Sequence, residues 1–239
     1  MLITVVCIYV FLSSTNAVFL EKRNQPIYRV DIEEKKIAIT VDVNWAEKEY
    51  LYDILDVLDK YNIKATFFVM GKWIVYPSGN VEKLKEIYNR GHEIGNHSYV
   101  HPDFAKIGKD RIVDEINKTE DIIKQVIGIK TELFRFPSGS YNDNGIKVVE
   151  ELSYKIIHWD VDSVDWKQLG LDSEYNRVIK NVKPGSIVLF HNNGKYTPSN
   201  LDKLIPELQS QGYEFVKVGE LIYKDSYEID NEGVQRRLK

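Results

Sequence analysis

Short apolar runs alternate along this chain with segments of helical periodicity, and this alternation restricts its fold more than any other feature. Seven runs, rich in β-branched and aromatic residues and bounded by charged or turn-forming residues, are typical of buried strands. They lie at residues 36–41, 65–70, 93–97, 133–136, 155–161, 186–191 and 213–218. A helix or a helical loop follows each run, so the pattern predicts parallel βα units.

The segments between the strands carry apolar residues at helical spacing, as do Leu51, Ile54, Leu55 and Leu58. Helices are expected at residues 47–61, 81–88, 110–127, 142–152, 173–182, 201–208 and 220–223. Gly91 and Gly128 are expected to end two of them, and Asp172 or Ser173 to open another. The charged, aperiodic residues after Lys224 predict a loose tail.

Polar residues at the ends of the strands favour one arrangement of these units. Asp42, His97, the segment around Arg135, Asp165 with its neighbour Asp162, and His191 all fall at or just after a strand's carboxyl end. An open sheet would spread these positions along a line, whereas a barrel gathers them around one axis. We therefore predict an α/β fold with one domain, a distorted (β/α) barrel of about seven parallel strands.

Charge and motif content exclude several function classes. The 239 residues carry a formal net charge of −4 and no Lys/Arg-rich run in mid-chain, which argues against a nucleic-acid-binding surface. No G-x-G-x-x-G or P-loop motif is present, so no nucleotide is expected. A phosphate-binding barrel with a metal is a poor fit, because the loop after His191 has one glycine, Gly194, and no helix start directly behind it.

The N-terminal segment differs from the rest of the chain. Residues 2–12 are apolar and small residues follow at 13–17, a pattern typical of a signal peptide although no Lys or Arg precedes it. Extended to residue 20, the same segment would suit a membrane anchor. We expect an exported protein with a signal or anchor at 1–20 and a linker at 21–34. The only cysteine, Cys7, lies in this segment, so disulfides and cysteine catalysis are not expected in the remainder.

His97 and His101 sit four residues apart in a chain with only five histidines. This spacing lets two imidazoles reach one metal ion, and imidazole is a common zinc ligand. Taken alone, the spacing fits two solvated loop histidines equally well.

Five motifs in order resemble those of the polysaccharide deacetylase family, also called the NodB-homology family or carbohydrate esterase family four. They read TVDVNW at 40–45, HSYVHP at 97–102, RFPSG at 135–139, DSVDW at 162–166 and LFH at 189–191. The resemblance covers residues 35–223 and implies a catalytic domain at 35–224, followed by a charged tail at 225–239. It also implies metal-dependent removal of N- or O-acetyl groups from sugars.

The resemblance assigns roles residue by residue. His97 and His101 correspond to the metal ligands, Asp42 to the general base and His191 to the general acid. Asp165 corresponds to the carboxylate that orients His191. The remaining matches are Arg135 as partner of Asp42, the Ser138 N–H as oxyanion donor, and Trp166, Leu189 and Tyr141 as pocket residues. Trp45 and Trp73 suit sugar platforms or core packing equally, and His92 and His158 are interpreted as structural.

One position departs from the family pattern. The family's first motif has two adjacent aspartates, and the second is the third metal ligand; this chain has Val43 there. A divalent metal, zinc by resemblance, should therefore bind weakly, with the Asn44 amide or a water in the vacant place. Two outcomes stay open: a deacetylase with a weakened metal site, or a family member that binds glycan without turnover. Peptidoglycan amino sugars are the first expected substrate, with chitin-type oligomers and ester-linked acetyl groups of xylan as alternatives.

Overall fold

A parallel sheet forms the centre of the fold in the computed structural model, which describes residues 25–238. Its strand order is β6-β5-β4-β3-β2-β8-β7, and β9 pairs with the start of β2. The bounds are β2 (Lys36–Val43), β3 (Thr66–Val69), β4 (Glu93–Asn96), β5 (Leu133–Phe134), β6 (Lys155–Ile156), β7 (Val161–Asp162), β8 (Ile187–His191) and β9 (Glu214–Phe215). Because every pairing is parallel, the carboxyl ends lie on one rim, and the predicted distorted barrel is confirmed.

The barrel is open between its two terminal strands, β6 and β7, which no pairing joins within residues 25–238. One strand was expected at 155–161, and the structure divides it in two. Residues between the halves bond elsewhere: Ile157 forms a bridge to Ile27, and the Asp160 carboxylate accepts hydrogen bonds from Ile187 N and Ser186 Oγ, both at 2.9 Å. These contacts are distant in sequence, so an apolar run cannot reveal the break.

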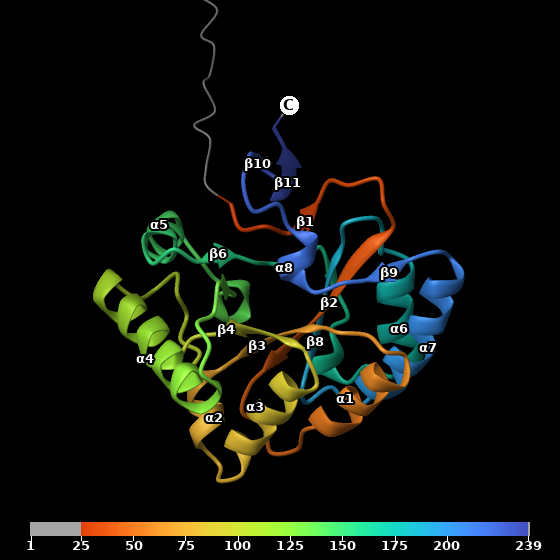
Figure 1. Ribbon diagram of the computed structural model, residues 1–239, viewed down its shortest axis with the longest axis horizontal. Coiled ribbons are helices and arrows are strands. Elements are labelled where there is room, and N and C mark those ends of the chain that lie inside the picture. The colour runs from red at the N-terminus through yellow and green to blue at the C-terminus, as the bar shows by residue number, and fades with distance from the viewer. Residues whose placement is uncertain (1–24, 239) are drawn as a thin grey trace, which may run out of the picture.

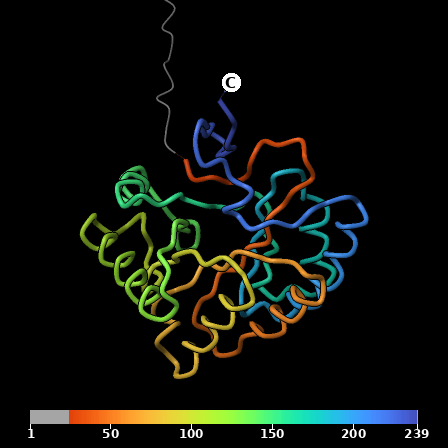
Figure 2. The backbone as a smooth tube through the Cα atoms, viewed as in Figure 1, coloured from red at the N-terminus to blue at the C-terminus, as the bar shows by residue number. Residues whose placement is uncertain are grey.

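Helices surround the outside of the sheet (Figures 1 and 2). They are α1 (Leu51–Lys60), α2 (Gly71–Val75), α3 (Asn80–Asn89), α4 (Lys109–Ile127), α5 (Asp143–Glu151), α6 (Leu171–Ile179), α7 (Thr197–Ser210) and α8 (Val218–Leu221). Gly128 ends α4 at φ 75°, as predicted. The N-cap of α6 is Gly170 and not Asp172 or Ser173, which lie in its first turn. The helix α2 was not expected, because five residues are too short to show a helical period.

Alternation along β2 gives its two faces different surroundings. The odd-numbered residues belong to the large cluster between the sheet and the helices; they are Ile37, Ile39, Val41 and Val43. On the other face, Ala38 belongs to a second cluster with Phe68. Thr40 and Asp42 share this face, on which both contact Arg135. The strand therefore turns Asp42 toward the barrel interior and Val43 toward the helices.

A second, three-stranded sheet lies at the upper end of the view in Figure 1. It contains β1 (Arg29–Val30), β11 (Val234–Arg237) and β10 (Tyr227–Ile229) in that order. The expectation of a loose tail is therefore wrong. Gln235 is fully buried, and its side chain accepts a hydrogen bond from Tyr223 N and donates one to Tyr223 O, each at 2.9 Å. Strands this short show no period in the sequence.

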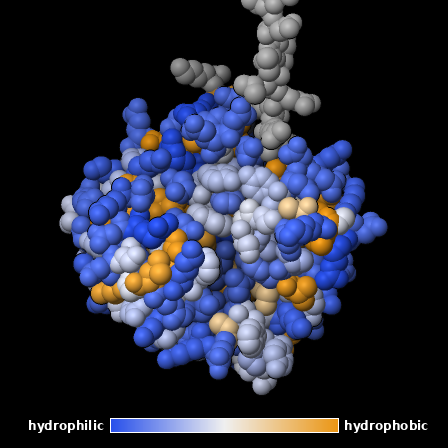
Figure 3. Space-filling model, turned by 180° about the vertical axis from the view of Figure 1, so that it is seen from behind, coloured by the Kyte–Doolittle hydropathy of each residue, from blue (hydrophilic) through white to orange (hydrophobic). Residues whose placement is uncertain are grey.

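The expected signal or anchor, at residues 1–20, lies outside the described residues. Within residues 25–238, none of the helices combines the length and the apolar character that a membrane crossing requires. Figure 3 shows the rear face of the molecule as mostly hydrophilic, with apolar patches separated by polar side chains.

Candidate active site

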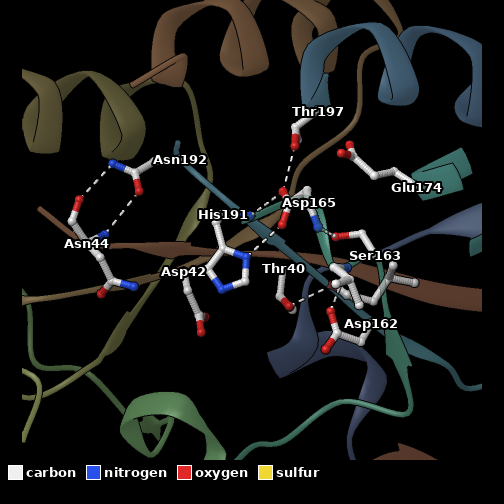
Figure 4. A network of polar contacts seen from close by, with 12 residues as sticks. Thr40, Asp42, Asn44, Asp162, Ser163, Asp165, Glu174, His191, Asn192 and Thr197 are labelled. Atoms are coloured by element: carbon white, nitrogen blue, oxygen red, sulfur yellow. Dashed lines mark hydrogen bonds and ion pairs between the residues drawn. The ribbon is translucent and has the colours of Figure 1, made fainter. Parts of the chain in front are cut away.

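A cavity of about 280 Å³ opens at the carboxyl ends of the central strands. It is lined by Asp42, Asn44, His101, Ser138, Trp159, Asp162, Trp166, Leu189 and His191. Asp42 and His191 are register partners at the ends of β2 and β8, so the two side chains lie side by side (Figure 4). A larger hollow of about 540 Å³ between α1 and α7 has neither histidine nor arginine in its lining. The candidate catalytic and metal-binding side chains therefore lie at the smaller cavity and not at the larger one.

Arg135 reaches Asp42 through the barrel interior, and both are buried. Its Nη1 donates to Asp42 Oδ1 and to Thr40 Oγ1, each at 2.8 Å, and its Nη2 donates to His158 O at 2.9 Å. The guanidinium carbon lies 4.1 Å from the centre of the Phe68 ring. The arginine is thus fixed by hydrogen bonds and by an aromatic face, and it holds one Asp42 oxygen.

Three cations or potential cations surround the Asp42 carboxylate. Burial alone would raise the pKa of Asp42, but Arg135, His97 and His191 outweigh it, and the pKa lies below the ordinary 3.8. The second oxygen, Oδ2, lies 3.5 Å from His97 Nε2 and is not held by Arg135. Asp42 is therefore an ionised carboxylate with one oxygen free to accept a proton.

His97 and His101 come together at the end of β4, with ring centres 5.0 Å apart. His97 Nδ1 lies 2.9 Å from Arg135 O; a carbonyl only accepts, so Nδ1 carries the proton and Nε2 keeps its lone pair. Burial lowers the pKa of His97 to about 4, and burial also lowers the pKa of His101. Both rings are therefore neutral at pH 7, the state that binds metals.

The loop after β4 folds back sharply to bring His101 to the cavity. Ser98 and His101 both adopt left-handed backbone conformations, at φ 65° and 59°, which non-glycine residues adopt at a cost. The buried Glu115 of α4 holds the loop from behind, because its Oε2 accepts from Tyr99 N at 2.7 Å and Val100 N at 2.8 Å. A strained, well-bonded loop is typical of a functional site.

The donor set fits a metal only in part. His97 Nε2 is buried and has no hydrogen-bond partner, which suits a ligand to a cation because unsatisfied buried polar atoms are costly. Within the described part of the chain, no group of three or more His, Cys, Asp or Glu side chains is arranged to hold a metal ion. The structure thus offers two imidazoles and no third ligand from those residue types.

His191 is held by Asp165, which lies beside its ring in Figure 4. Its Nδ1 lies 2.7 Å from Asp165 Oδ1, and its backbone N donates to Asp165 Oδ2 at 2.8 Å. Thr197 Oγ1 also donates to Oδ2, at 2.6 Å. Burial would lower the pKa of His191, but the hydrogen bond and charge of Asp165 outweigh it and raise the pKa above 6.5.

Neutralising Asp165 is expected to reverse that shift. In Asp165→Asn, the carboxylate charge that raises the pKa of His191 is gone and burial still lowers it. The pKa of His191 should therefore fall below the wild-type value. An NMR titration of the histidine ring signals checks this, and it needs no substrate. His92, whose pKa burial lowers to about 4, serves as an internal control that should not move. Equal His191 titrations in the two proteins would contradict the assigned role of Asp165.

The other predicted pocket residues separate into two groups. Leu189 is buried, Trp166 is 51% exposed, and both line the cavity with Ser138. Tyr141 is not part of that lining: its ring stacks on Phe136, and its hydroxyl lies 2.8 Å from the Tyr28 hydroxyl. The structure therefore brings Leu189, Trp166 and Ser138 together and leaves Tyr141 in a hydrogen-bonded cluster nearby.

The remaining aromatic and histidine candidates have clear surroundings. Trp73 is buried in the core and donates through Nε1 to Glu49, whereas Trp45 is 57% exposed. His92 Nδ1 accepts from Ala65 N at 3.1 Å. His158 is stacked between Tyr28 and Trp159, with ring centres 4.0 and 3.9 Å away. Core packing thus accounts for Trp73 and His92, and Trp45 alone of the two tryptophans faces solvent.

Sequence reasoning missed three residues that shape the site. Trp159 lines the cavity, Thr197 bonds Asp165, and Asn192 bonds the backbone of Asn44 on both sides, at 3.1 and 2.9 Å. Asn192 directly follows the strand-end residue His191, a position that gives a weak signal, whereas Trp159 lies inside the run predicted as one strand at 155–161. Thr197 opens a helix, and nothing local distinguishes it from a helix-start threonine.

Comparisons with known proteins agree with this geometry. A family model described as polysaccharide deacetylase matches residues 29–157. The protein YlxY of Bacillus subtilis, described as uncharacterized, is 36% identical over 83% of this chain and 60% of its own length. A peptidoglycan-N-acetylglucosamine deacetylase of Bacillus cereus is 38% identical over 76% of this chain and 66% of its own length. The chain thus spans under two thirds of these two relatives.

A solved structure of the same family is also similar to this chain. BA3943 of Bacillus anthracis, described as a CE4 family pseudoenzyme, superposes with a TM-score of 0.78 at 34% identity, over 90% of this chain and 70% of that one. A mutant of the same protein is described as having restored enzymatic activity. The strand-end site, the family match and this structural likeness lead to one conclusion: the chain belongs to the polysaccharide deacetylase family.

Proposed function

We propose that this chain is a metal-dependent hydrolase that removes N-acetyl groups from a polysaccharide, with peptidoglycan amino sugars as the first substrate to test. The observation that carries the proposal is the convergence of two charged pairs on one cavity. Asp42, paired with Arg135, and His191, paired with Asp165, line it side by side. The deacetylase relative of Bacillus cereus supports the substrate class.

Each residue takes a part that its geometry allows. A divalent metal held by His97 and His101, zinc as the first candidate, would lower the pKa of a water molecule and polarise the acetyl carbonyl. Asp42 accepts the proton of the attacking water at its free Oδ2. His191, held at Nδ1 by Asp165, gives a proton from Nε2 to the leaving nitrogen. In this proposal the Ser138 N–H donates to the developing oxyanion.

The cavity wall suits an acetyl group. Trp159, Trp166 and Leu189 provide apolar surface beside Asp42 and His191, so a methyl group would be buried next to the reacting carbonyl. The same machinery cleaves ester-linked acetyl groups, and an O-acetyl esterase is the variant of this proposal to test in parallel. Because such substrates lie outside the cell membrane, we propose an exported protein that acts at the cell surface.

Glycan binding without turnover is the second candidate. Val43 supports it, because a valine occupies the position where the family pattern has its third ligand. The likeness to BA3943, described as a pseudoenzyme, supports it as well. Asp42, His191, Asp165 and Arg135 are all present and paired, and a binder has no need of such pairs, so we favour the hydrolase.

Acetate release separates the two candidates. The full chain, supplied with Zn²⁺ or Co²⁺ at millimolar concentration, is expected to release acetate from N-acetylglucosamine oligomers or peptidoglycan, and not in the presence of a chelator. An acetylated xylan assayed in parallel tests the esterase variant. Glycan binding with no acetate at any metal concentration would reject the hydrolase and support the binder.

A further inference from the structure

Two buried polar atoms beside the cavity have no hydrogen-bond partner. Among the described residues such atoms are few, and His97 Nε2 and Asn44 Oδ1 are two of them. Asn44 lines the cavity together with Asp42 and His101, and His97 Nε2 lies 3.5 Å from Asp42. An unsatisfied buried acceptor is uncommon and calls for an explanation. His97 Nε2 is a lone-pair donor without a partner, so an electron-pair acceptor beside it would satisfy it.

The backbone of Asn44 is held in place by Asn192. Asn192 Oδ1 accepts from Asn44 N at 3.1 Å, and its Nδ2 donates to Asn44 O at 2.9 Å. Asn192 N donates to Asp42 O at 3.1 Å, and Glu49 Oε2 accepts from Asn192 Nδ2 at 2.7 Å. Both backbone polar groups of Asn44 therefore have hydrogen-bond partners, whereas its side-chain Oδ1 has none among the described residues.

The amide of Asn44 is free to present its oxygen to the site. Figure 4 shows the side chains of Asn44, Asp42 and His191 on the same side of the sheet, with the Asn44 nitrogen nearer to Asp42. No hydrogen bond within residues 25–238 involves either side-chain amide atom of Asn44. A half-turn about Cβ–Cγ exchanges oxygen and nitrogen, and here it breaks no hydrogen bond.

Val43 cannot supply the third ligand, because its side chain has no donor atom and is buried in the cluster that contacts the helices. We propose that Asn44 Oδ1 is the third protein donor to a divalent cation held by His97 and His101. This inference rests on the proposed function only for the presence of that cation. Amide oxygen is a ligand that divalent metals accept, although it carries no charge. The set is then three neutral donors, and the affinity should be lower than with a carboxylate.

Metal binding, measured apart from turnover, tests the inference. Cobalt titrations by calorimetry and visible absorption compare the full chain with three variants. Asn44→Ala is expected to weaken cobalt binding by about 10-fold or more, as the loss of metal-site residues does, and to change the absorption spectrum. Asn44→Asp is expected to bind more tightly than the wild type. Asn176→Ala, the same change at an exposed position on α6, should bind as the wild type does.

A further variant separates positioning from ligation. Asn192→Ala keeps the Asn44 donor but removes the two bonds that fix it, so its cobalt affinity should lie between those of the wild type and Asn44→Ala. Thermal unfolding of each metal-free variant shows whether the fold is kept. If Asn44→Ala alone is unfolded, the tighter binding expected of Asn44→Asp decides the question.

The results that overturn the inference differ from those that overturn the proposed function. Unchanged cobalt affinity and spectrum in both Asn44 variants, or no cobalt binding by the wild type at millimolar concentration, rejects Asn44 as a ligand. Cobalt binding through Asn44 without acetate release keeps the ligand and rejects the hydrolase. Acetate release together with cobalt binding that does not depend on Asn44 keeps the hydrolase and rejects Asn44 as a ligand.

Discussion

Replacing Arg135 with methionine is expected to lower the free energy of unfolding by about 3–5 kcal/mol. Arg135 and Asp42 are both buried and joined at 2.8 Å, and the substitution leaves the Asp42 carboxylate buried without its guanidinium. Removing one partner of a buried ion pair costs far more than the pair's net contribution. Denaturant unfolding at pH 7 measures the loss.

The loss of stability in Arg135→Met is also expected to depend on pH, in a direction that the pKa of Asp42 sets. In the wild type the pKa of Asp42 is depressed below 3.8, so its ionisation stabilises the fold above that pH, and this stability is lost as pH falls. In Arg135→Met burial raises the pKa of Asp42, so ionisation destabilises, and lowering the pH should relieve the loss. The double variant Arg135→Met/Asp42→Asn should be more stable at pH 7 than Arg135→Met alone.

A surface arginine is the matched control. Arg90 is partly exposed and bonds Asp56, Asp59 and Glu86 on the helix surface. Exposed ion pairs contribute about 0–1 kcal/mol each, so Arg90→Met should cost far less than Arg135→Met. Similar losses in the two variants would contradict the account of Asp42 as a charge held by one buried partner.

Replacing His191 with alanine is expected to lower the rate of N-deacetylation by a factor of about 10² to 10⁴, the usual contribution of a general acid or base. The nitrogen leaving group needs a proton, and His191 is the group that Asp165 holds beside the cavity. The rate of acetate release from an N-acetylated oligomer, compared with the wild type at equal metal loading, measures the effect.

Substrates with different leaving groups distinguish a His191 that acts as a general acid from one that is only structural. An aryl acetate departs as a phenolate and needs little protonation, so its hydrolysis should fall much less in His191→Ala than amide hydrolysis does. In Asp42→Asn, which removes the base, both substrates should slow together. If His191→Ala slows amide and aryl ester equally, His191 does not protonate the leaving group.

The features that could be predicted from the sequence are those that a local pattern of residues determines. Strand ends carry the chemistry, so Asp42 and His191 were expected on one rim, and the barrel was confirmed. The five motifs indicated the family, and the family match confirmed it. The helix over 110–127 and its glycine cap were also within a residue of α4, because a period of 3.6 over many residues is hard to mistake.

What the sequence did not reveal depends on contacts between distant residues. The break between β6 and β7 follows from bonds to Ile27 and Ser186, and the ordered tail follows from pairing with β1. Asn192 and Thr197 matter through partners that chain order does not indicate. Tyr141 stood beside a motif, yet its hydroxyl is bonded to Tyr28, since adjacency in sequence does not fix where a ring points.

The position of β1 places the start of the described chain away from the cavity. Arg29 in β1 forms a bridge to Ser186 and Val30 N bonds Gly185 O, directly before β8 begins, whereas His191 ends β8. At about 3.3 Å per residue, the entry of the described chain and the cavity lie at opposite ends of that strand.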